Sequence, residues 1–376
     1  MINYLAHSAN KHGENHSARE HLAEAAKLEK GFAGKAPWSD EAHLAGLLHD
    51  LGKYADLFQA RLRGEVSGLD HWSPGAWVAL KEFQSVAAAL AIQGHHVGLQ
   101  QGSLQSLRNL DPATLSQRHP LRLKLSDANI ERLKDRLADD NLNIAKPYSF
   151  IIKPKEGFKS PVAAMLDVRI LFSCLVDADF LSTESHFEGD EYGKKYRAVG
   201  PSLNTKEAIK ALEKHMTEKV HSVSEADMVV NDARNELWNR VIASASAAQG
   251  LFTLTAPTGS GKTLAMLKFA LEHAERNGLK RIVLVVPFLS IIEQTAAIYK
   301  TVFHSFPENF VLEHHSLAGL GIEEVKGDAE AENERARRLL AENWDAPIII
   351  TTNVQLLESL FSNRPSACRK LHNLMD

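Results

Sequence analysis

The sequence predicts a multidomain protein in which an all-α domain is followed by an incomplete α/β domain with a phosphate-binding loop. The length of 376 residues is enough for two domains of the usual size, about 100–200 residues each. Apolar residues recur at helical spacing through roughly the first 200 residues, with no convincing strand between them. After residue 200, β-branched runs alternate with helical segments. We therefore expect domains at 1–205 and 206–376, with the boundary near 200–225.

Composition indicates a soluble globular protein and excludes several other classes. Apolar residues make up 44% and charged residues 24% of the chain, which excludes a disordered tail, a coiled coil and a collagen-like chain. No apolar run reaches the ~18 residues of a membrane span. The N-terminus lacks the apolar centre of a signal peptide, and two cysteines are too few for a disulfide framework. We expect a cytoplasmic protein with no membrane partner.

The N-terminal domain is expected to contain four main helices. A helix begins near Ser39 and stops near Gly52, and another ends at Gly94. The polar stretch 101–160 is expected to be an insertion with one amphipathic helix near 127–138. Its charges are more typical of a solvated face than of a nucleic-acid contact. The four helices are predicted over 17–30, 39–51, 74–93 and 161–184.

The C-terminal domain is expected to contain a parallel sheet covered by helices on both faces. A helical stretch from about 205 to 247 leads into it. Strands are predicted over 251–255, 281–287, 310–315 and 347–352, and helices over 264–276, 289–303 and 329–342.

A phosphate-binding loop follows the first of these strands. Residues 256–263 meet the pattern G-x-x-x-x-G-K-[ST], except that Ala256 replaces the first glycine. Lys262 is placed to reach the β- and γ-phosphates of ATP, and the Thr263 hydroxyl to bind Mg²⁺. The nucleotide-binding residues are predicted to be Thr258, Gly259, Ser260, Gly261, Lys262 and Thr263.

Two later segments are similar to those that hold single-stranded nucleic acid in superfamily 2 helicases. They are residues 285–295 and 348–361, each at the end of a predicted strand in a RecA-like domain. The carboxylate pair that should follow on the next strand would lie just beyond residue 376, and the second RecA-like lobe is absent. We therefore expect a chain truncated within its first helicase lobe, which binds nucleotide weakly and does not turn it over.

Histidine is concentrated at the N-terminal end, where nine of the 18 histidines fall within the first 100 residues. Net charge is −4, so a polyanion would have to be held by a local basic patch or by bound metal. Imidazole and carboxylate suit divalent transition metals, and an aspartate can bridge two of them. The order of these residues predicts a binuclear site formed by His21, His49, Asp50, His71, His95, His96 and Asp177.

Two positions in this set have alternatives. Asp179 competes with Asp177, because both lie on the same predicted helix, and His16 competes with His21. The remaining histidines of this region are not expected to bind metal. They are His7, His12, His16 and His43.

The motifs together resemble a known family, the type I CRISPR interference nuclease–helicases, in which an HD-type nuclease domain precedes a DExH-type helicase. The resemblance covers most of the chain except 101–160, and only its length departs from the family pattern. Its HD part is carried by HDLGKYADLFQARLRG (49–64), DHWSPGA (70–76), IQGHHVG (92–98) and LVDADFLSTE (175–184). Its helicase part is carried by RNEL (234–237), LFTLTAPTGSGKT (251–263) and TTNVQLLESLFSNRPSACRKLHNL (351–374).

This resemblance implies metal-assisted cleavage of single-stranded DNA exposed by a guide-RNA surveillance complex. Asp50 would bridge or anchor the two ions as the central catalytic residue, and Lys53 would be the cation near the scissile phosphate. The histidine-rich ligand set favours Mn²⁺, Co²⁺, Ni²⁺ or Fe²⁺ over Mg²⁺.

Two other function classes remain open at this point. An HD phosphohydrolase acting on nucleotides or cyclic phosphodiesters would use the same ligands, but it has no need of a fused helicase-type motor. A non-enzymatic remnant would dock on the surveillance complex without translocating. Because the set of predicted metal ligands is intact, we expect that the chain retains hydrolytic activity and is not a non-enzymatic remnant.

Overall fold

A computed structural model describes residues 3–153, 160–220, 228–315 and 339–375 of the chain. The chain forms two compact units. The first comprises Met1–Arg197 and Ser359–His372, and the second comprises Ala198–Glu358 and Asn373–Asp376. The expected second domain, 206–376, therefore differs from the structure, because a segment near its end packs with the N-terminal unit.

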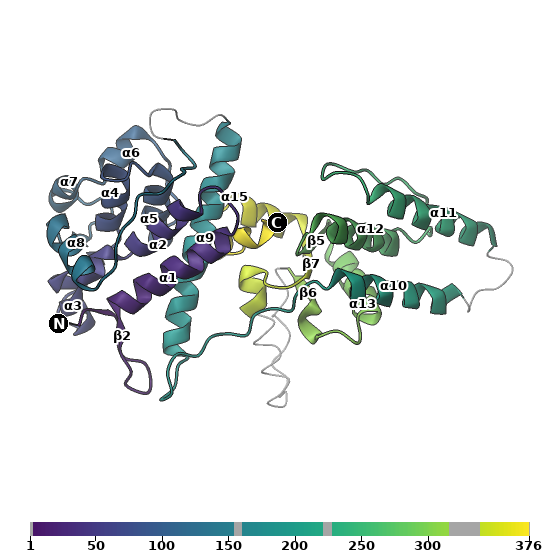
Figure 1. The fold of residues 1–376 in the computed structure, drawn as a ribbon, viewed down its shortest axis with the longest axis horizontal. Helices are drawn as coiled ribbons and strands as arrows, with labels where there is room; N and C mark the ends of the chain where they lie inside the picture. Colours follow the sequence, from purple (N-terminus) through teal and green to yellow (C-terminus); the bar gives the residue numbers. More distant parts are fainter. Residues whose placement is uncertain (1–2, 154–159, 221–227, 316–338, 376) are drawn as a thin grey trace. The chain divides into compact units, whose positions relative to one another are not determined.

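The first unit is built around one long helix, α9 (Pro161–Phe187). Three other helices pack along it: α1 (Ala18–Ala33), α2 (Ser39–Leu48) and α5 (Val86–Val97) (Figure 1). Helix α9 buries residues around much of its circumference, which is typical of a helix surrounded by other elements. The helices expected over 17–30, 39–51 and 161–184 correspond to α1, α2 and α9.

Local sequence explains where these helices begin. Ser17 and Glu20 form a reciprocal capping box at the start of α1. Helix α9 starts with Ser160, whose side chain accepts a hydrogen bond from the Ala163 amide, and with Pro161 in the first turn. These caps satisfy backbone donors that would otherwise lack a partner.

The helix expected over 74–93 is divided in the structure. Helix α4 (Ser73–Lys81) ends before a short turn, and α5 begins at Val86. Gln84 has a positive φ of 58°, which an α-helix does not allow, and Ser85 caps α5 by accepting from the Ala88 amide. The sequence prediction missed this serine cap because the apolar periodicity continues across it.

The first unit also contains two small sheets, which the all-helical expectation did not include. Strands β1 (Leu5–His7) and β2 (His16–Ser17) pair antiparallel. Strands β3 (Leu69–Asp70) and β4 (Lys124–Leu125) pair parallel. Helix α3 (Asp56–Leu62) follows a short 3-10 helix, η1 (Leu51–Tyr54).

The region predicted to be an insertion, 101–160, contains short elements around β4. They are α6 (Leu104–Arg108), α7 (Pro112–Gln117) and α8 (Ile130–Asp139). Helix α8 corresponds to the helix expected near 127–138.

The second unit contains a three-stranded parallel sheet in the order β5-β7-β6, with its helices grouped around it (Figure 1). The strands are β5 (Ile282–Val286), β6 (Val311–His314) and β7 (Ile348–Thr352), at three of the four expected positions. Their helices are α10 (Thr205–Val220), α11 (Met228–Ser244), α12 (Lys262–Asn277) and α13 (Leu289–Val302). The second unit also contains η3 (Glu308–Phe310) and most of α15 (Asn353–Phe361). The segment that returns to the first unit contains α16 (Pro365–Cys368) and the start of η4 (Leu371–Leu374).

Residues on β7 alternate between two hydrophobic clusters. Ile348 and Ile350 join side chains from α10, α12 and α13 in one cluster. Ile349 joins Leu340 and Trp344 in another. Because successive strand residues point to opposite faces, the sheet is buried on both sides, as parallel sheets usually are.

The strand expected over 251–255 does not form. These residues are exposed and pair with no strand in the described part of the chain, although the segment is rich in β-forming residues. A strand requires a neighbour for its backbone N–H and C=O groups, so propensity alone does not create one. Of the helix expected over 329–342, residues 329–338 lie outside the described residues. No described helix is long and apolar enough to cross a membrane.

Candidate functional site

Asp50 lies at the centre of a cluster of buried imidazoles in the first unit. Its Oδ1 atom is 3.3 Å from Nε2 of His71, 3.3 Å from Nε2 of His95 and 3.7 Å from Nε2 of His96. Its other oxygen, Oδ2, faces a different pair of histidines. One carboxylate therefore connects two groups of nitrogen ligands.

The second group surrounds Oδ2 of Asp50. Nε2 of His21 lies 3.3 Å away and Nε2 of His49 lies 3.4 Å away. Oδ1 of Asp179 completes this group, 3.4 Å from His21 Nε2 and 3.7 Å from His49 Nε2. Metal–nitrogen bonds of about 2.0–2.1 Å place ligand atoms roughly 3–3.4 Å apart, so these spacings match a metal site.

Separate elements bring these residues together. His21 lies on α1, whereas His49 and Asp50 follow the last turn of α2. His95 and His96 occupy the last turn of α5, and Asp179 lies on α9. The core of the helical unit thus fixes the positions of side chains that are far apart in sequence.

Gly52 lets the segment after Asp50 approach the loop that carries His71. Its amide donates to the His71 carbonyl at 2.9 Å. A Cβ at Gly52 would lie 2.5 Å from that carbonyl oxygen and 2.4 Å from Ser126 Oγ. Only glycine fits this approach without displacing the loop that carries His71.

Hydrogen bonds fix the orientation of three of the imidazoles. Nδ1 of His49 donates to the Gly46 carbonyl at 2.8 Å, and Nδ1 of His95 donates to the Ile92 carbonyl at 2.7 Å. Ser182 Oγ donates to Glu24, so it accepts from Nδ1 of His21 at 3.1 Å. A proton on Nδ1 leaves Nε2 with its lone pair directed toward Asp50, the arrangement typical of metal-binding histidines.

This geometry leaves acceptor atoms facing one another. Nε2 of His21 and Nε2 of His49 are 3.1 Å apart, and when both rings are neutral with the proton on Nδ1, each of these atoms carries a lone pair. Asp50 Oδ1 and His95 Nε2 are buried and have no hydrogen-bond partner among the described residues. A cation between such atoms would remove their repulsion and replace the missing bonds, so the donor set fits divalent metal.

Burial determines the charge state of most of these histidines. Burial, together with the Lys53 charge, lowers the pKa of His21 to about 3. Burial also lowers the pKa of His71 and of His95. At His49, burial acts in the same direction, but Asp50 and Asp179 outweigh it and raise the pKa. Neutral imidazole is the form that binds metal, so His21, His71 and His95 are prepared as ligands.

Lys53 adds a positive charge next to the carboxylate. Its Nζ atom lies 2.8 Å from Asp50 Oδ2, and both side chains are buried. Burial disfavours the charged carboxylate, but Lys53 and His49 outweigh this effect and hold the pKa of Asp50 well below its usual value. Asp50 is therefore an anion ready for metal.

Asp177 does not join the cluster, contrary to the preferred reading of the sequence. Its Oδ1 atom lies 2.7 Å from Arg369, and its Oδ2 atom lies 3.5 Å from His372. The alternative residue, Asp179, takes the position beside His21 and His49. Residues two apart on a helix point in directions about 200° apart, so only one of the two can face the histidines.

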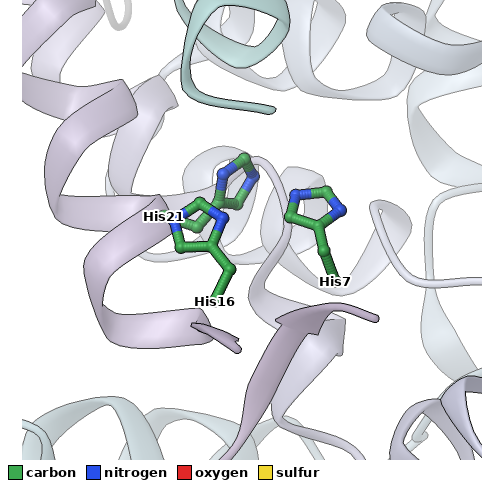
Figure 2. A group of neighbouring side chains, drawn as sticks. All are labelled: His7, His16 and His21. Carbon is green, nitrogen blue, oxygen red and sulfur yellow. The ribbon is translucent and has the colours of Figure 1, made fainter. Parts of the chain in front are cut away.

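The other histidines of this region differ in their surroundings. His12 is exposed, and His43 bonds to the Ala26 carbonyl at 3.2 Å. His7 and His16, which were not expected to bind metal, both lie beside His21 (Figure 2).

Two residues next to the loop that carries His71, Asp70 and His119, were not predicted from the sequence. Asp70 Oδ1 accepts from the amides of Trp72 and Ser73, at 3.1 and 2.9 Å. Its Oδ2 accepts from His119 Nε2 at 2.8 Å. His119 belongs to the region expected to be an insertion, and no sequence spacing links it to Asp70.

The phosphate-binding loop lies in the second unit, at the N-terminus of α12. Gly259 and Gly261 adopt positive φ values of 80° and 81°. Lys262 Nζ donates to the carbonyls of Ala256 and Pro257 at 2.8 and 2.7 Å. Arg234, within the predicted RNEL motif, donates to the Gly259 carbonyl at 3.2 Å. The predicted residues 258–263 thus surround a helix N-terminus, which favours phosphate.

Comparisons with known proteins agree with this architecture. Residues 206–372 match the family model for the res subunit of type III restriction enzymes, ResIII. The CRISPR-associated nuclease/helicase Cas3 of Haloferax volcanii is 25% identical over 378 residues. That alignment covers 85% of this chain and 40% of the relative.

Solved structures of T. fusca Cas3 have a similar fold. One crystal structure matches 99% of this chain and 45% of its own, with a TM-score of 0.61 and 17% identity. A second, described as Cas3-ATP, covers the same shares with a TM-score of 0.59 and 18% identity. The chain spans less than half the length of these relatives. The chain is thus similar in sequence to a CRISPR-associated nuclease/helicase and similar in fold to solved Cas3 structures.

Proposed function

We propose that the histidine–aspartate cluster is a binuclear metal centre that cleaves single-stranded DNA by phosphodiester hydrolysis in CRISPR interference. The observation that carries this proposal is the position of Asp50, whose two oxygens face two separate groups of Nε2 atoms. This arrangement is typical of a carboxylate that bridges two ions. Mn²⁺, Co²⁺, Ni²⁺ or Fe²⁺ suits the nitrogen-rich set better than Mg²⁺.

Different residues of the cluster would hold the two ions and bind the substrate. His21, His49 and Asp179 would hold one ion, and His71, His95 and His96 the other, with Asp50 shared. Bound ions would supply a nucleophilic water at neutral pH and offset the charge that develops on phosphorus. Lys53, next to Asp50, would bind a non-bridging oxygen of the substrate phosphate.

The cluster reaches the protein surface at His96. The side chain of His96 is 36% exposed, whereas the side chains of His21, His49 and His95 are fully buried. A phosphodiester would therefore approach from the side of His71 and His96, whose Nε2 atoms are 3.0 Å apart.

The second unit would bind ATP-Mg at the phosphate-binding loop as part of a helicase. In this structure Lys262 donates hydrogen bonds to two loop carbonyls. The phosphates of a bound nucleotide would replace these carbonyls as its partners. The Haloferax volcanii relative is named a CRISPR-associated nuclease/helicase, which supports a guide-RNA surveillance complex as the partner that exposes DNA to this chain.

The deciding experiment is cleavage of circular single-stranded DNA without ATP, in Mn²⁺, Ni²⁺ or EDTA. We expect nicking that needs metal, and Asp50→Ala should lower it at least about 100-fold because a ligand shared by both ions is lost. Asp40→Ala is the matched control, since Asp40 lies in the first turn of α2, the helix that precedes Asp50, and pairs with Lys30 at the surface.

Two outcomes would reject the proposal. Cleavage by Asp50→Ala at the rate of the parent would show that the centre is not involved. Hydrolysis of 2′,3′-cyclic nucleotides in place of DNA would assign the same centre to a phosphohydrolase.

A further inference from the structure

The loop that joins α7 to β4 carries positive charge without a balancing carboxylate. Residues 112–125 contain three arginines and lysines and no aspartate or glutamate, although the whole chain has a net charge of −4. The three side chains are exposed, and none of them pairs with a carboxylate of the described residues. A local excess of positive charge attracts a polyanion. We call residues 118–124 the basic loop, and its cations are Arg118, Arg122 and Lys124.

Hydrogen bonds hold the basic loop in a defined conformation. The buried ring of His119 accepts from the amides of Leu121 and Leu123 through Nδ1, at 3.1 and 3.4 Å. Its Nε2 donates to Asp70, and strand β4 at the end of the loop pairs with β3. A loop fixed in this way presents its charges at a lower entropy cost on binding. It therefore differs from the solvated face that the sequence alone favours.

Arg122 has a backbone conformation that arginine rarely adopts. Its φ is 56°, in the left-handed region where glycine has no steric penalty. Its amide donates to the His119 carbonyl at 3.0 Å, so this conformation is part of the turn. A long cationic side chain at a position that glycine would fill more easily points to a role for the side chain itself.

The basic loop ends close to the histidine–aspartate cluster. Lys124 is paired with Leu69 in the register of β4 and β3, and His71 follows Leu69 by two residues. At about 3.3 Å per residue along a strand and about 4.8 Å between strands, the backbones of Lys124 and His71 are within roughly 10 Å. His71 lies beside His96, where the cluster reaches the surface. A strand of a few nucleotides can therefore contact both the loop and the cluster.

A cavity of about 410 Å³ lies beside Lys124. Leucines form part of its wall, and the two aspartates that line it are paired with arginines. An apolar hollow next to a cation fits a nucleotide, because a base has apolar faces and its phosphate is an anion. The leucines include Leu57, Leu115 and Leu123, and the ion pairs are Asp56–Arg136 and Asp127–Arg132.

We propose that the basic loop binds the phosphate backbone of single-stranded DNA, with Arg118, Arg122 and Lys124 each contacting a phosphate and a base occupying the cavity beside Lys124. The inference rests on the proposed function for the identity of this substrate. Contacts to phosphate carry no sequence information, so the loop would hold a strand of any sequence. The stretch 101–160 would then be part of the path that brings DNA to the cluster.

The test is the affinity for a fluorescein-labelled oligothymidylate, measured by fluorescence anisotropy in EDTA at several salt concentrations. On a single strand, the logarithm of the affinity falls with the logarithm of the salt concentration by about 0.7 for each phosphate contact. Loss of three contacts should therefore reduce this slope by about 2 and weaken binding roughly 100-fold at 0.1 M salt. The variant is Arg118→Gln/Arg122→Gln/Lys124→Gln.

The matched control removes three exposed cations elsewhere in the same unit. Equal affinity and equal slope in the loop variant and in this control would overturn the proposal. If circular dichroism shows that the loop variant does not fold, Arg118→Gln and Lys124→Gln serve singly, each with an expected loss of about 5-fold at 0.1 M salt. The control is Lys27→Gln/Lys30→Gln/Arg63→Gln.

A charge-retaining variant separates charge from shape. Arg118→Lys/Arg122→Lys should bind nearly as tightly as the parent, because contacts to phosphate depend mainly on charge. Binding as weak as in the glutamine variant would contradict a role for these charges. Tighter binding of an RNA oligonucleotide than of DNA, lost in the same glutamine variant, would assign the loop to RNA and overturn the proposal.

The outcome is independent of the metal centre. Because EDTA removes metal, weaker binding by the loop variant supports the site even where the parent does not cleave, a result that would count against the proposed function alone. In the cleavage assay, the loop variant should raise KM and leave kcat unchanged, since the lost contacts form with substrate and transition state alike. A lower kcat at an unchanged KM would show that the loop acts on the cluster and is not a binding site.

Discussion

Asp177 and Asp179 illustrate how two neighbouring carboxylates acquire different roles from the faces of one helix. Asp179 lies beside His21 and His49, where burial would raise its pKa but His49 outweighs this effect and lowers it well below the usual value. Asp177 lies on another face of α9, against Arg369. The first environment fits the proposed metal ligand, and the second is that of a buried ion pair.

This difference predicts opposite effects for the two amide substitutions. Asp179→Asn should lower the bound metal and reduce DNA cleavage by at least about 10-fold, with little change in stability. Asp177→Asn should keep the metal count and destabilise the fold by about 3–5 kcal/mol, because it leaves the Arg369 charge buried without its carboxylate. Elemental analysis and thermal unfolding of both variants check this pair, and exchanged phenotypes would restore Asp177 as the ligand.

The sequence could predict most of the histidine–aspartate site but not the choice between these two residues. The adjacent pairs His49-Asp50 and His95-His96 can be recognised directly in the sequence. Which face of α9 points toward the histidines depends on how the helix packs. The hydrogen bond from His119 to Asp70 likewise depends on tertiary structure, because the two residues lie 49 positions apart in sequence. His7 and His16 lie side by side because of the register of two very short strands, β1 and β2.

At the scale of elements, the packing of α1 against α2 encloses a carboxylate. Glu29 is fully buried on α1, and neither of its oxygens has a hydrogen-bond partner among the described residues. One oxygen lies 2.9 Å from where a Cβ on Gly46 would stand, so the absence of a side chain there makes room for it. Burial raises the pKa of Glu29 well above its ordinary value of 4.5.

The sign of this shift predicts how stability depends on pH. Below pH about 4.5, Glu29 is protonated in both folded and unfolded chains and carries no penalty. As pH rises, the unfolded chain loses this proton first, so the folded state becomes less stable. Glu29→Gln should therefore raise the melting temperature at pH 7–8 by a few degrees, and the gain should vanish toward pH 4.5.

Thermal unfolding across this pH range measures the effect. Glu14→Gln provides the control, because Glu14 is exposed in the loop between β1 and β2. A gain that stayed constant between pH 4.5 and 8 would exclude the ionisation of Glu29 as its cause.

The region of the phosphate-binding loop shows which secondary-structure elements could not be predicted from the sequence. The loop and α12 are where the sequence places them, but the strand expected over 251–255 is absent because no described strand pairs with it. The division of 74–93 into two helices has a comparable origin in one residue with a positive φ. Motifs and periodicity predict local elements, while pairing and tight turns depend on what surrounds them.

Lys262→Ala should separate the two proposed activities. Loss of a charged hydrogen-bond donor costs about 1.5–3 kcal/mol, which corresponds to roughly 10- to 100-fold weaker ATP-Mg binding. Cleavage of single-stranded DNA without ATP should not change, because Asp50 and its histidines lie in the other unit. A fluorescent ATP analogue measures the binding, with the exposed residue Lys206 replaced by Ala as control. Reduced cleavage in Lys262→Ala would show that the units do not act independently.

At the scale of the whole molecule, the helical unit is completed by a segment from the other end of the sequence. Residues 359–372 belong to it, and several contacts tie them to α9. Arg169 donates to the Leu360 carbonyl at 2.5 Å, Ser173 Oγ contacts His372 Nδ1 at 3.1 Å, and Arg369 pairs with Asp177 at 2.7 Å. The fold that positions the histidine–aspartate cluster therefore depends on residues far from it in sequence.

Arg369→Met should destabilise the helical unit, although Arg369 lies 192 residues from its partner. Removing one member of a buried ion pair costs about 3–5 kcal/mol, because the remaining charge stays desolvated. We expect a lower melting temperature and faster proteolysis of the region 1–197, with Arg364→Met, an exposed arginine of the same segment, as control. Adding Asp177→Leu to Arg369→Met should restore much of the loss, since no charge is then left unpaired. If the double variant is no more stable than Arg369→Met alone, the ion pair is not what ties the segment to α9.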